Sequence, residues 1–132
     1  TDIQGRSFAN NLQGDTPDNW RQSMYYHYYE YPYWHHVQPH YGIRTQRYKL
    51  IHFYYNMDVW EFYDLEKDPS ELNNLIHSEK HARIVKKLKR ELRDLKKTYK
   101  NNLSLKELRA ITDTDFGGLE SSKKTNNSND VD

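Results

Sequence analysis

The hydrophobic positions between residues 23 and 65 fall into four runs, which predict four short β-strands. Each run is rich in aromatic and β-branched residues and is bounded by turn-forming residues. We expect the strands at Ser23–Tyr31, His40–Thr45, Tyr48–Tyr55 and Val59–Leu65, with a tight hairpin around Gln46. The short connections favour an antiparallel meander, because parallel neighbours need long crossovers.

A helical period replaces these runs from Glu79 to Lys100. Apolar residues recur there every three or four positions, at Ile84, Val85, Leu88, Leu92, Leu95 and Tyr99. Ser78 is the expected N-cap, and the helix would span roughly 30 Å, enough to cross a four-stranded sheet. We therefore expect an α+β fold: a four-stranded antiparallel sheet with a long amphipathic C-terminal helix packed across one face.

Both faces of the expected sheet carry apolar residues. In the third strand Ile51 and Phe53 share one face, and Leu50 with Tyr54 shares the other. A sheet with one solvated face shows a cleaner polar alternation. Because the helix can cover only one face, we expect a second body to cover the other.

Three regions differ in composition. Residues 1–22 are expected to form a connecting arm, because residues 1–19 contain Gly, Pro and several Asn and Asp, with Ile3, Phe8 and Leu12 as their apolar anchors. Residues 23–100 form the compact unit. Residues 101–132 are expected to hold a short helix at Ser104–Ile111 followed by a disordered tail. Because the chain begins at Thr1 without Met or a signal sequence, it is expected to be cut from a longer precursor.

Charge and cysteine content narrow the classes of partner. Twenty Lys and Arg stand against nineteen Asp and Glu, so a formal charge of +1 gives no bulk argument for nucleic acid. No apolar run approaches the roughly 20 residues that cross a bilayer, so no membrane partner is expected. The chain has no Cys, which excludes a disulfide framework and a thiolate metal site.

A histidine-rich stretch is the first candidate for chemistry. Four histidines cluster in the sequence near Glu30, at His27, His35, His36 and His40. Three imidazoles can hold zinc, but the spacing of the last two suits a helix, which Pro39 and Gly42 disfavour. We expect no metal site. A loop that binds a polar ligand through imidazole and aromatic faces, or simply packed and solvent-facing histidines, explains the stretch better.

Basic residues around the hairpin are the second candidate. Arg44, Arg47 and Lys49 could bind a planar anion such as sulfate or a carboxylate. Interleaved aromatics and bases also suit single-stranded nucleic acid, which the net charge disfavours. Alternatively, these bases pair with carboxylates such as Glu61 and Asp64.

The stretch from Asp68 to Leu75 reads as a turn between the last strand and the helix. Asp and Asn side chains can hydrogen-bond the local backbone there, and Leu72 and Leu75 are expected to anchor the turn to the core. The chain holds no G-x-S-x-G elbow and no glycine-rich phosphate loop. We therefore expect no catalytic residue in this chain.

Two sequence blocks resemble a known family. H-Y-G-I-R-T-Q-R-Y-K-L-I-H-F-Y and W-E-F-Y-D-L-E-K-D-P-S-E-L-N-N-L are similar, in order and spacing, to the C-terminal subdomain of the type I sulfatases. Upstream, I-Q-G-R-S-F-A-N-N-L-Q-G resembles the segment that leaves the catalytic domain of that family. The Y-H-Y-Y-E-Y-P pattern is most similar to bacterial glycan sulfatases that resemble N-acetylglucosamine-6-sulfatase.

The resemblance implies docking on a larger α/β catalytic domain, which would supply the second cover. In this family a formylglycine made within a C/S-x-P-x-R motif attacks the sulfate ester beside a calcium ion. This chain has no such motif, so both cofactors are expected in the catalytic domain. The resemblance carries over only His35, His40 and Arg44, as residues facing a sulfated carbohydrate substrate. Tyr33, Trp34 and Pro39 depart from the subgroup and leave the sugar open.

The expected function is therefore the C-terminal subdomain of a periplasmic or secreted sulfatase, inactive by itself, that completes the substrate cleft. A free-standing carbohydrate-binding or scaffold module is the alternative from another class. A fragment that buries its open sheet by self-association is a third.

Overall fold

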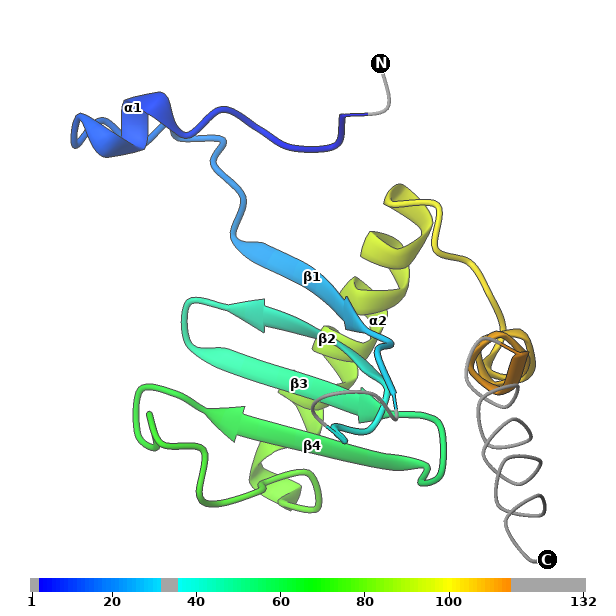
Figure 1. The fold of residues 1–132 in the computed structure, drawn as a ribbon. Helices are drawn as coiled ribbons and strands as arrows, with labels where there is room; N and C mark the ends of the chain where they lie inside the picture. Colours follow the sequence, from blue (N-terminus) through cyan, green and yellow to red (C-terminus); the bar gives the residue numbers. More distant parts are fainter. Residues whose placement is uncertain (1–2, 32–35, 115–132) are drawn as a thin grey trace, which may run out of the picture.

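The computed structural model describes residues 3–31 and 36–114, and the following statements concern these residues. Four strands form one antiparallel sheet in sequence order: β1 (Ser23–Tyr28), β2 (His40–Thr45), β3 (Tyr48–Phe53) and β4 (Val59–Asp64). A 3₁₀ turn, η1 (Glu79–His81), leads into the long helix α2 (Ala82–Thr98). Figure 1 shows α2 crossing one face of the sheet. The predicted α+β architecture is confirmed.

β2 has the predicted bounds, whereas β1, β3 and β4 end earlier than the sequence predicted. β1 was expected to reach Tyr31 but ends at Tyr28, which pairs with His40 at the start of β2. Pro39, just before His40, has no N–H to continue the ladder. Similarly, β3 ends at Phe53, and the N–H of the next residue bonds to the Pro39 carbonyl at 3.2 Å instead.

The hairpin between β2 and β3 turns at Gln46, as predicted. Thr45 closes it with its side chain, since Thr45 Oγ1 accepts from the Tyr48 N–H at 2.8 Å and lies 3.2 Å from the Tyr48 carbonyl. Arg44 and Lys49 form the last paired residues before the turn.

The core lies between the sheet and α2. Its buried side chains come from β2, β3, β4 and α2, and include Ile43, Leu50, Phe62, Val85, Leu88 and Leu92. Leu50 and Tyr54 belong to this cluster, whereas Ile51 and Phe53 point to the other face, as the alternation predicted. Burial of this many large apolar side chains supplies the main driving force for folding.

The start of the helix differs from the expectation. Ser78 precedes the 3₁₀ turn, but its hydroxyl caps no backbone N–H; it lies 2.9 Å from His81 Nδ1. The α-helix proper begins at Ala82, too far along the chain for Ser78 to cap it. The expected capping role of Ser78 is therefore wrong.

The turn after β4 is held by Asp68, as predicted. Its carboxylate accepts from the N–H groups of Leu72 at 3.1 Å and Asn73 at 2.8 Å. Leu75 packs against the core, but Leu72 is 80% exposed. The predicted anchoring role of Leu72 is therefore wrong, because the two Asp68 bonds fix the turn with this side chain pointing to solvent.

The two flanking regions differ in how they meet the core. The arm contains a single short helix, α1 (Ala9–Leu12), and extends away from the sheet (Figure 1). Its expected anchors are exposed: Ile3, Phe8 and Leu12 by 82%, 59% and 77%. Residues 105–114 are helical and bury Leu108 in the core cluster. Most of the predicted disordered tail lies outside the described residues.

Candidate functional site

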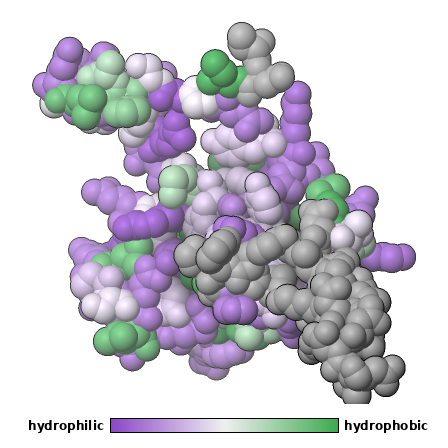
Figure 2. All heavy atoms as spheres, viewed as in Figure 1, coloured by the Kyte–Doolittle hydropathy of each residue, from purple (hydrophilic) through white to green (hydrophobic). Residues whose placement is uncertain are grey.

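Two surfaces carry candidate chemistry, one on each side of the sheet. The first is the side not covered by α2, here called the open face. By strand alternation and register it presents Met24, Tyr26, Tyr28, His40, Gly42, Arg44, Lys49, Ile51, Phe53, Val59, Glu61 and Tyr63. Figure 2 views the molecule from this side and, where grey atoms do not cover it, shows hydrophobic residues in small patches among hydrophilic ones. Arg44, Lys49 and Glu61 stand among the apolar residues of this face, so it is more mixed than the sequence predicted.

His40 and Arg44 both lie on the open face, at opposite ends of β2. Four residues separate them, which is roughly 13 Å along an extended strand. The structure places the two residues on one surface but does not bring them into contact. The third predicted residue, His35, lies outside the described residues.

His40 sits in an aromatic setting with one ring nitrogen fixed. Nδ1 lies 2.8 Å from the Gln38 carbonyl, which can only accept, so Nδ1 carries the proton in this bond. The ring stacks on Tyr28 at 5.4 Å and lies 5.0 Å from Phe53. A neutral His40 therefore keeps Nε2 as a hydrogen-bond acceptor.

The basic residues of the hairpin divide into paired and unpaired ones. Arg47 binds the buried Asp64 carboxylate and Lys49 binds Glu71, so for these two residues pairing with carboxylates is confirmed, with Asp64 among the predicted partners. Arg44 differs: among the described residues it forms no ion pair and donates only to the Thr45 carbonyl at 2.9 Å. Its remaining N–H groups are available to an anion.

Two tyrosines of the open face keep unused hydroxyls. The hydroxyl oxygens of Tyr26 and Tyr28 are shielded from solvent and have no hydrogen-bond partner among residues 3–31 and 36–114, and the same holds for Gln38 Oε1. Buried polar atoms without partners are costly in a finished protein. Three of them around His40 mark the part of the surface where a partner group would relieve that cost.

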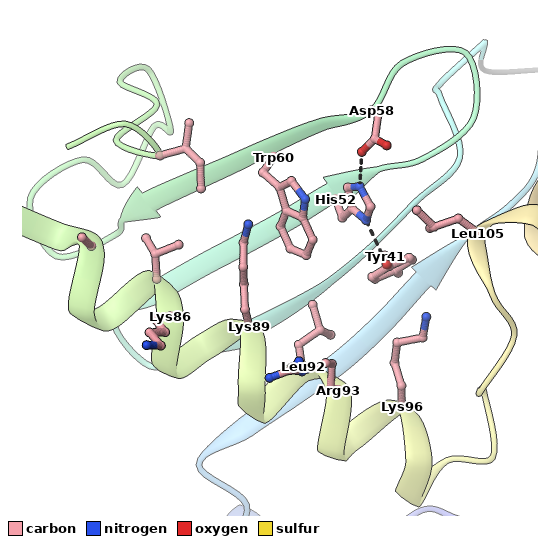
Figure 3. A pocket seen from close by; sticks show the side chains of 13 residues that line it. Tyr41, His52, Asp58, Trp60, Lys86, Lys89, Leu92, Arg93, Lys96 and Leu105 are labelled. Carbon is pink, nitrogen blue, oxygen red and sulfur yellow. Dashed lines mark hydrogen bonds and ion pairs between the residues drawn. The ribbon is translucent and has the colours of Figure 1, made fainter. Parts of the chain in front are cut away.

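The second surface is a groove of about 720 Å³ between α2 and the sheet, here called the basic groove. Its floor is a row of three aromatic rings in register on adjacent strands, Tyr41, His52 and Trp60 (Figure 3). His52 stacks flat on Trp60 at 4.1 Å and meets the Tyr41 ring edge-on at 5.2 Å.

A chain of hydrogen bonds fixes this row. The Tyr41 hydroxyl donates to His52 Nδ1 at 2.8 Å, and His52 Nε2 donates to Asp58 at 2.7 Å. Burial lowers the pKa of His52 and outweighs the Asp58 carboxylate, so the ring is neutral near pH 7. The bond from His52, aided by Arg109, holds the pKa of Asp58 below its usual range.

Lysines from α2 close the groove over the two outer rings. Lys89 Nζ lies 4.0 Å from the Trp60 ring centre, and Lys96 Nζ lies 4.1 Å from that of Tyr41. These are cation–π distances. Figure 3 shows both side chains reaching from the helix toward the sheet, with Lys86 and Arg93 on the same stretch of α2.

Neither surface offers a metal centre within the part of the chain that the structure describes. There, no three His, Asp or Glu side chains gather as metal ligands. The described residues therefore do not fit the calcium ion that the family resemblance implies. None of the helices in these ranges is long and apolar enough to cross a bilayer.

Sequence reasoning missed the basic groove. It treated Arg44, Arg47 and Lys49 as the candidate bases, although the four groove cations recur along α2 at helical spacing. Strand alternation alone places Tyr41, His52 and Trp60 on the helix side. Only the strand register, however, aligns the three rings in one row.

Solved structures first define the class of this domain. Its fold matches a 2-O GAG sulfatase with a TM-score of 0.64 and 28% identity, covering 75% of this chain and 21% of that one. It also matches a protein solved with its substrate D-glucosamine-2-N,6-O-disulfate, with a TM-score of 0.73 and 49% identity, covering 77% and 21%. The chain thus has the fold of a sulfatase domain.

A match between this sequence and a protein-family model shows which family the chain belongs to. The chain belongs to the family described as N-sulphoglucosamine sulphohydrolase, C-terminal, whose model matches residues 1–98. It is 50% identical over 104 residues to the N-acetylglucosamine-6-O-sulfatase of Bacteroides thetaiotaomicron, covering 77% of this chain and 19% of that protein. The chain is therefore a C-terminal sulfatase domain that spans about a fifth of its relatives' length.

Proposed function

We propose that this domain completes the substrate cleft of a sulfatase that hydrolyses sulfate esters of a glycan. The observation that carries the proposal is the 50% identity to an N-acetylglucosamine-6-O-sulfatase over 77% of the chain. A sulfated glucosamine residue is the favoured substrate, because a second relative was solved with D-glucosamine-2-N,6-O-disulfate as its substrate. The whole protein is expected to act in the periplasm or after secretion.

The open face is the side proposed to dock on the catalytic domain. Met24 and Val59 are 48% and 42% exposed there, and the Tyr26 and Tyr28 hydroxyls find no hydrogen-bond partner in the described part of the chain. The arm supports the same conclusion, since its apolar side chains are exposed although the family model includes them. Exposed apolar side chains beside shielded polar atoms that lack partners among the described residues support a protein contact on this side.

Arg44, His40 and His35 are proposed to contact the substrate. Arg44 has N–H groups free of any carboxylate among the described residues, and a guanidinium suits a sulfate group. His40 offers Nε2 to a sugar hydroxyl while Gln38 holds its other nitrogen. These side chains bind and orient, whereas formylglycine and calcium belong to the catalytic domain, because this chain has no C/S-x-P-x-R motif.

The test is sulfate release from N-acetylglucosamine-6-O-sulfate by the complete protein that contains this chain. We expect turnover by the complete protein and none by the 132-residue chain. Arg44→Gln in the complete protein should lower kcat/KM by about 10- to 100-fold, as expected for a lost charge-assisted contact. Arg90→Gln, the same change on α2, is the matched control.

Two outcomes would overturn this proposal. One is a complete protein that releases no sulfate and has no C/S-x-P-x-R motif, which would favour a free-standing carbohydrate-binding or scaffold module. The other is turnover by the purified 132-residue chain alone. A separate measurement tests whether the open face is a docking surface. In gel filtration, the 132-residue chain with this face undocked should self-associate as its concentration rises.

A further inference from the structure

The positive charge of this chain is concentrated on one helix. The formal charge of the whole is +1, yet residues 79–100 hold ten Lys and Arg against three Asp and Glu. Net charge therefore conceals a strongly basic element. A local field of one sign attracts a polyanion whatever the charge of the remaining surface.

The basic groove gathers part of this charge beside a recess. Lys86, Lys89, Arg93 and Lys96 line it, and they recur at three- and four-residue steps on one side of α2. Asp58 is the acidic residue in the lining, and it is already bonded to His52 and to Arg109. The groove therefore carries an excess of positive charge.

Two of these cations are held at a fixed spacing. Seven residues separate Lys89 from Lys96 on α2, a rise of about 10 Å. The rings beneath them belong to β4 and β2, which are two strand spacings or about 10 Å apart. Because helix rise and strand spacing agree, each ammonium group sits over its own ring.

Both ammonium groups keep unused donors. Within the described residues neither Lys89 nor Lys96 donates a hydrogen bond to another side chain or to the backbone. Each is half-buried, and burial lowers the pKa of both. An anion entering the groove would supply the acceptors that these partly dehydrated cations lack.

We propose that the basic groove binds two anionic sulfate groups of one sulfated glycan chain, one at Lys89 and one at Lys96. The glycan class rests on the proposed function, whereas the anion site rests on the groove alone. It lies on the opposite side of the sheet from His40 and Arg44. A long glycan held there would stay near the protein between encounters with the cleft, which raises its effective concentration.

The recessed shape of the basic groove suits a glycan chain better than the flat anionic surface of a membrane. The donors of Lys89 and Lys96 lie between α2 and the sheet, where a narrow chain of sugar rings can enter. A membrane would reach mainly the exposed rim residues Lys86 and Arg93. Nucleic acid would be expected to stack its bases on open aromatic faces, but lysines cover the Trp60 and Tyr41 rings.

The test measures binding of a heparin-derived hexasaccharide to the 132-residue chain by calorimetry, with an unsulfated hexasaccharide of equal length for comparison. Lys89→Gln with Lys96→Gln should weaken binding at least about 10-fold. Lys80→Gln in η1 with Lys87→Gln on the other flank of α2 removes the same charge and should weaken binding less than about 3-fold. Lys89→Arg with Lys96→Arg should retain binding, which separates lost charge from lost folding.

Binding should also shift the NMR signal of the Trp60 indole N–H. The inference is overturned by absent binding, by equal binding of the unsulfated chain, by equal losses in both glutamine pairs, or by tighter binding to phosphatidylserine vesicles or single-stranded DNA. None of these measurements depends on hydrolysis. A protein that binds through the groove but releases no sulfate would overturn the proposed function alone, and sulfate release without groove binding would overturn this inference alone.

Discussion

Arg47 donates two parallel hydrogen bonds to the buried carboxylate of Asp64, from Nε to Oδ1 at 2.9 Å and from Nη2 to Oδ2 at 2.8 Å. Asp64 is 1% exposed, at the end of β4, whereas Arg47 belongs to the β2–β3 turn. This bidentate ion pair therefore links the β2–β3 hairpin to the edge strand β4.

Replacing Arg47 should destabilise the domain more than its partly exposed position suggests. Arg47→Met leaves the Asp64 carboxylate buried without its cation, which is costlier than losing an exposed pair. We expect a clear fall in the urea midpoint, a smaller one for Arg47→Lys, and almost none for Arg90→Met. Equal midpoints for the two methionine variants would contradict the argument.

The same pair predicts a pH dependence. The Arg47 hydrogen bonds hold the pKa of Asp64 below its usual range, so the unfolded state takes up this proton first as the pH falls. The stabilisation is present above about pH 4 and is lost as the pH falls through the lowered pKa. Urea unfolding between pH 5 and 2 should show a steeper loss in the parent chain than in Arg47→Met.

Gly42 is required by a close approach rather than by its backbone angles. A Cβ there would lie 2.5 Å from both the Leu50 carbonyl oxygen and the Tyr26 hydroxyl. Gly42→Ala should therefore cost about 2 to 3 kcal/mol, because the paired backbone of β3 cannot move away. Gly5→Ala is the control, because a Cβ at Gly5 would have no atom within 4 Å. If chemical unfolding shows that both variants lose a similar free energy of unfolding, the close-approach explanation is refuted.

Two buried tyrosine hydroxyls should respond oppositely to removal. The Tyr26 hydroxyl has no hydrogen-bond partner within the described ranges, so Tyr26→Phe should leave stability unchanged or raise it by up to about 1 kcal/mol. The Tyr54 hydroxyl lies 2.7 Å from His27 Nε2, and Tyr54→Phe should cost about 1 to 2 kcal/mol. Denaturant unfolding of the isolated chain measures the stability of both variants. A loss of stability in Tyr26→Phe would contradict the prediction and would mean that the Tyr26 hydroxyl has a hydrogen-bond partner.

His27 should make the domain sensitive to mild acid. Burial, aided by Lys96, lowers its pKa to about 4, and it lies between Tyr54 and the Asn101 amide. Because the unfolded histidine binds a proton near pH 6.5, stability falls as the pH drops from about 6.5 to 4. The loss in the free energy of unfolding should stay below about 3 kcal/mol, because solvent screens the partly exposed ring, and urea unfolding measures it. His27→Gln should flatten this slope, and an unchanged slope would exclude His27 as its source.

Much of the fold could be predicted from local pattern. Runs of aromatic and β-branched residues between turn residues located four strands. A period of 3.6 located the helix, because an amphipathic helix turns one apolar side toward the core. The errors lie at ends and anchors. Leu72 and the arm residues were expected to be buried, but whether an isolated apolar residue finds a partner depends on the path of the whole chain.

The candidate site was also only partly predictable from the sequence. Arg44 and His40 could be singled out by residue type and by family resemblance, whereas their unpaired or fixed states follow from neighbours that sequence alone does not supply. The basic groove escaped notice because it joins residues from β2, β3, β4 and α2.

The sequence by itself determined the class of fold, the amphipathic helix and the family, since these depend on periodicity and on motifs contiguous in the chain. Tertiary structure alone decided which cations are paired, which hydroxyls lack partners, and that Lys89 and Lys96 stand over Trp60 and Tyr41. The physical reason is that charge pairing and burial depend on distances of a few ångströms between residues far apart in the chain. Those distances are fixed only when strand register and helix docking are set together.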